Sequence, residues 1–244
     1  MAFIAAVTFL TVLRPPWQPS AEALRGAPSF FPLVGALLGI ALALVDQALR
    51  LALPVPVVSA VLLLLLFGAT GGLHLDGLAD TCDAFFATGV TPERRLEIMR
   101  DSHVGAYAIA GVALVLLAQY ASLAALSPTM RGVVLLLTTT LSRWTMAMAI
   151  ALFPYARTEG LGAAFRTGPS VWRILWPTAF VFVVALLVAG PAGPMILAAV
   201  GLTAWATARA LLGRLPGLTG DTYGAIHEVA QTAVLVFAHA VWPA

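Results

Sequence analysis

Seven long apolar stretches follow one another along this chain, and they limit what it can fold into. Each is about 20 residues long, which is the length a helix needs to cross the ~30 Å hydrocarbon layer of a bilayer. Hydrophobic residues make up 61% of the chain and charged residues 10%, whereas about a quarter of a soluble domain is charged. The sequence therefore predicts an all-α, polytopic membrane bundle of about seven transmembrane helices in one domain over residues 1–244. The stretches are 30–53, 55–73, 104–126, 131–153, 171–190, 194–212 and 225–242.

The amino-terminal segment, residues 1–13, is also apolar but is short for a straight crossing. It has no basic residue at its start and leads into the RPPW sequence without a small-residue cleavage site, so it does not resemble a removable signal peptide. We expect a short apolar helix here, and the sequence leaves open whether it crosses the membrane.

All 13 basic residues are arginines, and they are unevenly distributed between the two sides that alternate crossings define. By the positive-inside rule, the arginine-rich side is cytoplasmic, so we expect a multi-pass membrane protein whose chemistry faces the cytoplasm. Scattered single arginines do not form the basic stripe of a nucleic-acid binder, and the sequence leaves homo-oligomer formation open. The arginine-rich side receives Arg14, Arg25, Arg94, Arg95, Arg100, Arg157, Arg166, Arg173, Arg209 and Arg214, and the other side Arg50 and Arg131.

An acidic cluster follows the second apolar stretch. Asp76, Asp80 and Asp83 are four and three residues apart, so on a helix their carboxylates share one face and repel one another. Carboxylate oxygens suit Mg²⁺ or Mn²⁺, and Mg²⁺ is commonly shared with substrate phosphates. The three aspartates are therefore predicted metal ligands, with a solvated helix end as the alternative. His74 is a candidate base, although a hydrogen-bonded structural role is the more usual one for such a histidine.

Residues 91–103 are typical of a short surface helix, with Thr91 as its cap and an apolar side. The segment ends where the chain re-enters the membrane, beside the acidic cluster. Arg100 is therefore a candidate contact for an anionic substrate, and Asp101 and His103 are candidate bases.

Two charges are predicted to lie inside spans. Arg143 stands in the middle of an apolar stretch, where a guanidinium costs a few kcal/mol unless it is paired or faces a water-filled cavity. It is a candidate phosphate contact. Asp46 could pair with Arg50 four residues later or face Arg143.

Two further polar segments on the arginine-rich side are rich in glycine. Residues 154–165 supply Arg157, and residues 217–225 supply Gly220, Asp221 and Thr222. Glycine-rich loops let backbone N–H groups approach phosphate oxygens, so Arg157, Gly220 and Thr222 are candidate substrate contacts and Asp221 is a fourth candidate base. Together with the aspartates, these segments would give phosphoryl-transfer chemistry its acids and arginines.

Several of these segments resemble the cobalamin synthase family, the adenosylcobinamide-GDP ribazoletransferases of prokaryotic vitamin B12 assembly. The resemblance implies an inner-membrane, Mg²⁺-dependent enzyme that joins adenosylcobinamide-GDP to α-ribazole or its 5′-phosphate and releases GMP. In that reaction Asp76, Asp80 and Asp83 would hold the metal. The segments lie in the family's order: FPLVGALLGI at 31–40, GGLHLDGLADTCDAFF at 71–86, RRLEIMRDSHVGAYA at 94–108, SRW at 142–144, PYARTEGLG at 154–162 and GLTGDTYGA at 217–225.

The sequence departs from the family's pattern at Cys82 and at AFF in 84–86, where a smaller or glycine-containing variant is expected. Two alternatives remain. Membrane CDP-alcohol phosphotransferases also arrange aspartates around metal, but the DGLAD segment lacks their arginine and their spacing. A transporter or binding protein would place its charges near the bilayer midplane, whereas these acids gather at one rim.

Overall fold

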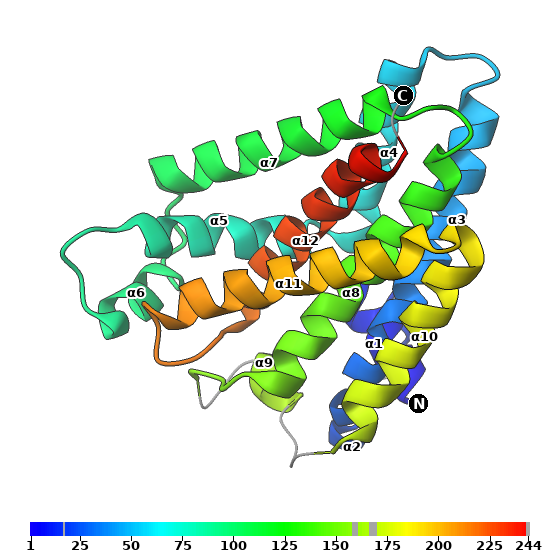
Figure 1. The fold of residues 1–244 in the computed structure, drawn as a ribbon. Helices are drawn as coiled ribbons and strands as arrows, with labels where there is room; N and C mark the ends of the chain where they lie inside the picture. Colours follow the sequence, from blue (N-terminus) through cyan, green and yellow to red (C-terminus); the bar gives the residue numbers. More distant parts are fainter. Residues whose placement is uncertain (17, 158–160, 166–169, 243–244) are drawn as a thin grey trace.

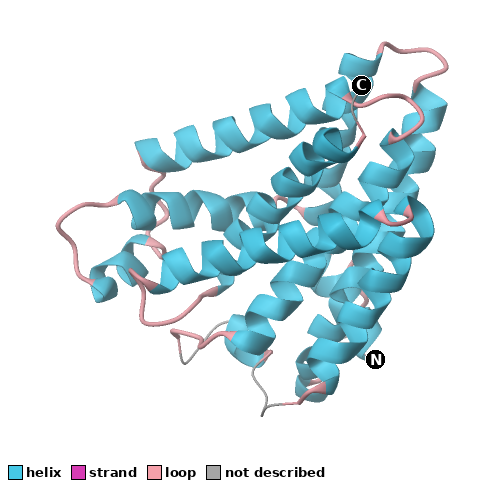
Figure 2. Cartoon of the chain, viewed as in Figure 1, coloured by secondary structure: helices cyan, strands magenta, loops and turns pink. Residues whose placement is uncertain are grey.

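The computed structural model is a bundle of helices, which confirms the predicted all-α class (Figure 2). It describes residues 1–16, 18–157, 161–165 and 170–242, so Glu159 and Arg166 lie outside the described residues. Within those ranges no strand is formed, and one isolated bridge joins Tyr155 to Leu218. The helices are α1 (Ala2–Leu10), α2 (Ala21–Gly26), η1 (Ala27–Phe30), α3 (Phe31–Leu49), α4 (Val55–Thr70), α5 (Leu73–Phe86), α6 (Pro92–Ile98), α7 (Ala106–Ala125), α8 (Arg131–Leu152), α9 (Leu161–Ala164), α10 (Trp172–Ala189), α11 (Ala192–Leu212) and α12 (Gly220–Val241).

Six helical segments in the described chain are long and apolar enough to cross a membrane. They coincide with the predicted stretches apart from 55–73, and the run that contains α3 begins earlier, at Ala21. The helix α4 passes the same test only together with α5, from which it is bent by 90°. The single straight span predicted for residues 55–73 is therefore replaced by a bent pair of helices. The short helix α1 agrees with the expectation for residues 1–13.

The bend between α4 and α5 depends on two adjacent glycines. Gly71 and Gly72 have φ values of 62° and 71°, in the left-handed region that residues with a Cβ rarely adopt. The side chain of a residue at position 72 would also meet the ring of Phe67. The GG pair therefore allows the chain to turn sharply before the acidic helix begins.

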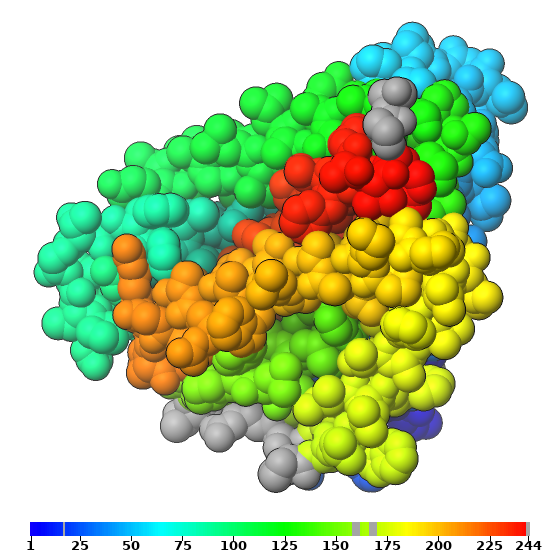
Figure 3. All heavy atoms as spheres, viewed as in Figure 1, coloured from blue at the N-terminus to red at the C-terminus, as the bar shows by residue number. Residues whose placement is uncertain are grey.

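The helix α8 lies at the centre of the bundle, with α3 and α12 packed against it (Figure 1). In Figure 3, α10, α11 and α12 form the near face, and α8 is visible only in part. Gly35 and Gly39 allow α3 to approach α8 closely, because a Cβ at either position would lie within 2.5 Å of an oxygen of Thr139. The connections before α6, α9 and α12 gather toward one end of the bundle, and the connection between α3 and α4 lies at the other (Figure 1).

Asp46 is buried near the end of the bundle that lies away from those longer connections. Its two carboxylate oxygens accept hydrogen bonds from Arg131 Nε and Arg50 Nε, each at 2.8 Å. Of the two partners that the sequence suggested, Arg50 is correct and Arg143 is wrong. Arg131 neutralises the second oxygen, so this buried acid is part of a paired structural cluster.

The helices α5 and α12 are in close contact because of two further glycines. A Cβ at Gly77 would lie 2.6 Å from the carbonyl oxygen of Asp221, and one at Gly224 would lie 3.0 Å from that of His74. Both distances are below ordinary van der Waals contact. The small residues therefore bring the acidic helix α5 directly against the amino end of α12.

We predict that Gly77→Ala destabilises the protein by about 1–3 kcal/mol, the usual cost of overpacking. Thermal unfolding in detergent would measure the change. Gly68→Ala on α4 is the matched control, since no atom of the described chain lies within 4 Å of the position that a Cβ would take there and alanine is the better helix former. Equal melting temperatures for Gly77→Ala and the control would contradict the close-contact interpretation.

Candidate functional site

A cavity of about 220 Å³ opens where α5, α12 and the segment after α8 meet. Its acidic and basic side chains come from separate parts of the sequence: Asp76 from α5, Asp221 from α12, and Arg157 from the segment that follows α8. The other lining residues are Phe9, Leu73, His74, Gly77, Met146, Ile150, Tyr155, Gly162, Phe165, Gly220, Tyr223 and Gly224. We call this space the acidic cavity.

The chain around residues 154–156 is fixed to the segment that precedes α12. The Ala156 N–H donates to Leu218 O, and the Leu218 N–H donates to Pro154 O, each at 2.8 Å. This pairing places the next side chain, Arg157, beside α12. Arg157 Nη2 lies 2.9 Å from Asp221 Oδ2, which makes an ion pair at the cavity wall.

The carboxylates of the site are crowded. Asp80 interacts electrostatically with Asp221 and Asp76, which repel its charge, and with Arg157, which attracts it. Asp76 and Asp80 are on α5, so the close packing of α5 on α12 adds Asp221 to the predicted cluster. The sequence suggested Asp221 as a base but did not place it among the α5 aspartates.

Asp83 has a different environment from the other two α5 aspartates. Its Oδ2 accepts a hydrogen bond from the Gly105 N–H at 2.6 Å, and its Oδ1 accepts one from the Ala108 N–H at 2.9 Å. These donors belong to the first turn of α7, whose N–H groups lack partners within the helix. Asp83 therefore caps α7 from a distance, and its lone pairs are directed at backbone rather than at the cavity.

The segment expected to be a glycine-rich loop is largely helical. α12 begins at Gly220, five residues before the predicted span, and Thr219 caps it. Thr222 forms the second half of a capping box, since its Oγ1 accepts from the Thr219 N–H at 2.7 Å. Thr222 is fully buried in this structural role, whereas Gly220 lines the acidic cavity.

A buried polar cluster lies beneath the acidic cavity. The His74 ring stacks on the His227 ring with 3.7 Å between centroids. His227 Nε2 lies 3.1 Å from Ser142 Oγ, and Glu228 accepts a hydrogen bond from Gln119 Nε2 at 2.9 Å. The packing favours a structural role for His74, which lines the cavity but is only 3% exposed.

Arg143 belongs to this buried cluster rather than to the cavity wall. It is fully buried on α8, donates to Thr139 O at 3.1 Å, and interacts electrostatically with Glu228. It lines a separate internal space of about 20 Å³ together with His74 and His227. The opposite charge that acts on it is Glu228, which the sequence did not single out, and the two form no ion pair within 4 Å.

His227 and Gln119 were not among the residues predicted from the sequence. Their signal was present, because polar residues inside otherwise apolar stretches are costly and usually functional or paired. The predicted last span began at Ala225, so His227 and Glu228 were treated as ordinary residues of that span.

Tyr155 was missed as well. It lines the acidic cavity, and burial raises the pKa of its phenol. The phenol therefore remains a neutral hydrogen-bond donor.

The three candidates at the end of the surface helix α6 do not line the acidic cavity, although Arg100 lies near its wall. The helix itself forms as predicted, with Thr91 accepting a hydrogen bond from the Arg94 N–H. Asp101 and His103 pair with each other at 2.6 Å and are largely exposed. Hydrogen bonds from the His103 side chain and backbone lower the pKa of Asp101, which makes it a weaker base. Arg100 is exposed but close enough to interact with Tyr155.

The carboxylates of this site are suited to a divalent cation that is shared with water and substrate phosphates. In the described part of the chain, no three histidine, cysteine or acidic side chains are arranged to hold a metal by themselves. Mg²⁺ rarely needs such a cage, since it is usually held by one or two carboxylates, water and substrate phosphates. The mutual repulsion of Asp76, Asp80 and Asp221 would be relieved by a cation between them.

The fold and the site define a class: a polytopic helical membrane protein with carboxylates and an arginine around a cavity at one end of its bundle. The family model for cobalamin-5-phosphate synthase matches residues 2–239, so the chain belongs to this family. No solved structure matches it.

Curated relatives are similar in sequence to this protein over nearly its whole length. An adenosylcobinamide-GDP ribazoletransferase of Synechococcus sp. is 38% identical over 240 residues, which cover 95% of this chain and 93% of the relative. Enzymes of the same name from Desulforamulus reducens and Ectopseudomonas mendocina are 37% and 38% identical. The first pair covers 94% of this chain and 92% of the relative, and the second covers 95% of each.

We predict that Asp83→Ala lowers the free energy of unfolding by about 1–2 kcal/mol, as the loss of a helix cap does. Asp80→Ala should not lower it, because the change removes a carboxylate that its neighbours repel. Thermal unfolding of both variants without metal would compare them. The capping role would be wrong if Asp83→Ala melted at the wild-type temperature.

Proposed function

We propose that this protein transfers the adenosylcobinamide phosphoryl group from adenosylcobinamide-GDP to α-ribazole or α-ribazole 5′-phosphate and releases GMP. The observation that carries the proposal is the acidic cavity, which Asp76 and the Arg157–Asp221 pair line together. Asp80 is close enough to interact electrostatically with all three. Family membership over residues 2–239, and relatives named adenosylcobinamide-GDP ribazoletransferase, support this choice of substrates. This would be the joining step that completes the corrinoid nucleotide.

The reaction replaces a phosphoanhydride bond with a phosphate ester bond. A hydroxyl oxygen of the nucleoside forms a bond to the phosphorus attached to cobinamide, and the bond from that phosphorus to the bridging pyrophosphate oxygen breaks. GMP leaves with the bridging oxygen, and the hydroxyl proton passes to a base. The protein must therefore neutralise a diphosphate, align the hydroxyl and accept one proton.

Asp76 and Asp80 would hold Mg²⁺. Asp221 interacts electrostatically with Asp80 and would therefore also be stabilised by the charge of the ion. When bound, the ion would neutralise pyrophosphate oxygens and the charge that develops on the leaving phosphate. This set differs from the trio predicted from the sequence, since both oxygens of Asp83 accept backbone hydrogen bonds. Mg²⁺ is preferred because carboxylate and phosphate oxygens are its usual ligands.

Arg157 would bind a phosphate oxygen of the substrate. The Arg157 side chain lies at the cavity wall and is 14% exposed. A planar guanidinium can donate two parallel hydrogen bonds to a phosphate. Substrate binding would partly replace Asp221 as its partner. The backbone of Gly220 lines the same wall and leaves room for close approach.

Asp221 is our choice for the general base. Of the four candidates from the sequence, only Asp221 and His74 line the cavity, and the Asp221 side chain is 23% exposed while His74 is stacked and almost fully buried. A base must reach the attacking hydroxyl directly. His74 would instead support the floor of the cavity through its contact with His227.

The acidic cavity would lie at the cytoplasmic side of the inner membrane and open toward the cytoplasm. The helix α6 and the connections before α9 and α12 lie toward the same end of the bundle (Figure 1). They carry Arg94, Arg95, Arg157 and Arg214, and Arg100 follows α6 directly. The positive-inside rule assigns that end to the cytoplasm, where nucleotide substrates are found.

The assay that tests this function measures GMP release from adenosylcobinamide-GDP by the purified full-length protein in detergent. We expect release that depends on α-ribazole, that stops with EDTA and that returns with Mg²⁺. Release of a nucleoside monophosphate from a CDP-alcohol substrate instead, or no turnover by verified, folded protein, would contradict the proposal.

Two aspartate variants extend this assay, one as the test and the other as its matched control. Asp80→Asn should lower kcat by about 10²–10³-fold, as the loss of a group that stabilises transition-state charge does, while the protein remains folded. Asp101→Asn changes an exposed carboxylate away from the cavity and should retain turnover. Equal losses in the two variants would remove the reason for placing the chemistry at Asp80.

A further inference from the structure

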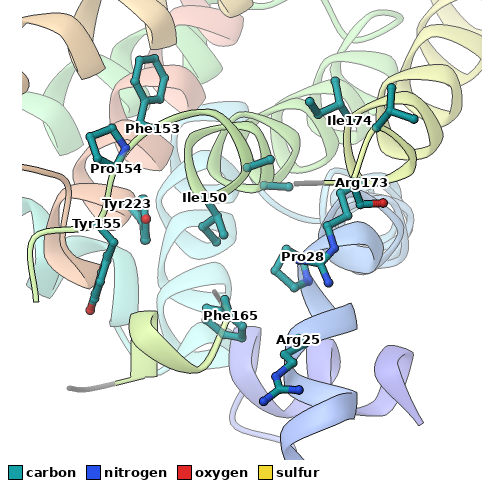
Figure 4. A pocket seen from close by; sticks show the side chains of 14 residues that line it. Arg25, Pro28, Ile150, Phe153, Pro154, Tyr155, Phe165, Arg173, Ile174 and Tyr223 are labelled. Atoms are coloured by element: carbon teal, nitrogen blue, oxygen red, sulfur yellow. The ribbon is translucent and has the colours of Figure 1, made fainter. Parts of the chain in front are cut away.

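A second cavity adjoins the acidic one. Its volume is about 410 Å³, within the roughly 300–1,000 Å³ range of small-molecule sites. The two spaces share wall residues: Ile150, Tyr155, Phe165 and Tyr223 line both. In Figure 4, Tyr155 and Tyr223 lie on one side of this second space, and Arg25 and Arg173 lie on the other. We call it the arginine cavity.

Two guanidinium groups from separate helices face this cavity. Arg25 ends α2 and Arg173 begins α10, and the charges are close enough that each disfavours the other. Among the residues that the structure describes, neither guanidinium lies within 4 Å of a carboxylate. Two converging cations without an acidic partner would be relieved by an anion between them. Guanidiniums bind phosphate and carboxylate groups through two parallel hydrogen bonds.

The rest of the wall is suited to a flat, partly apolar group. Phe153, Tyr155 and Phe165 supply rings and Ile150 and Ile174 supply aliphatic surface. Aromatic side chains bind nucleoside bases by stacking. The arginine cavity therefore combines what a nucleoside monophosphate needs, a phosphate contact at one side and a ring surface toward the other.

We propose that the arginine cavity binds the phosphorylated acceptor, with Arg25 and Arg173 on its 5′-phosphate; this rests on the proposed function. The acceptor must place a ribose hydroxyl at the acidic cavity, while its 5′-phosphate is carried on a different ribose carbon. Neighbouring cavities with a shared wall at Tyr155 and Tyr223 provide two such places. The arginine pair would then determine how strongly the enzyme prefers the phosphorylated acceptor to the free nucleoside.

The experiment compares kcat/KM for α-ribazole 5′-phosphate with kcat/KM for α-ribazole, using full-length protein in nanodiscs of neutral lipid. For Arg25→Ala and Arg173→Ala we expect the ratio to fall about 10-fold or more, the effect of losing one charge-assisted hydrogen bond. Arg94→Ala is the matched control, because Arg94 is an exposed arginine of α6 that pairs with Glu97, and it should leave the ratio unchanged.

Three results would overturn the proposal. The first is an equal loss for both acceptors in the Arg25 and Arg173 variants, which would indicate a structural role. The second is a kcat/KM ratio for the two acceptors that is the same in Arg25→Ala and Arg173→Ala as in the wild type. In the third, adding phosphatidylglycerol to the nanodiscs would change turnover of both acceptors equally and only when the arginines are present, which would identify a lipid headgroup as the anion. Wild-type turnover of α-ribazole tests the proposed function separately.

Discussion

The close contact of α5 with α12 is the constraint on which the site depends. Gly77 and Gly224 leave no room for a Cβ between the helices, so Asp221 comes near the α5 aspartates. Carboxylates at this spacing repel one another, and Arg157 provides one compensating charge. In our proposal, a divalent cation and a diphosphate provide the rest. Tyr223, next to Gly224 on α12, lines both the acidic cavity and the arginine cavity, so α12 contributes to both proposed binding spaces.

Most of the fold could be predicted from the sequence, because a bilayer imposes helix length and excludes unpaired backbone. The predicted spans fail where a tertiary contact decides the outcome. The stretch 55–73 reads as one crossing, yet α4 ends at Thr70 and the chain bends by 90° at Gly71 and Gly72. The glycine pair signalled a bend, but its angle depends on what α5 packs against, and that information lies elsewhere in the chain.

The site was predicted in part. Helical spacing placed Asp76, Asp80 and Asp83 on one helix, but it could not show that α7 would occupy Asp83 with its backbone N–H groups. Polar residues inside spans posed the same difficulty. Arg143 needed a partner, and Glu228 is a distant residue on another helix. Spacing reveals which side chains share a helix face, whereas long-range pairing depends on how the helices are arranged.

Binding of Mn²⁺ as a spectroscopic substitute for Mg²⁺ tests the central claim most directly. Electron paramagnetic resonance of the purified full-length protein, titrated with Mn²⁺ in the presence of GMP, would report the bound ion. Our account predicts saturable binding by the wild type that is lost when Asp76 and Asp80 are both changed to asparagine and is kept in Asp83→Asn. Binding that survives in the double variant, or is lost with Asp83 alone, would contradict it.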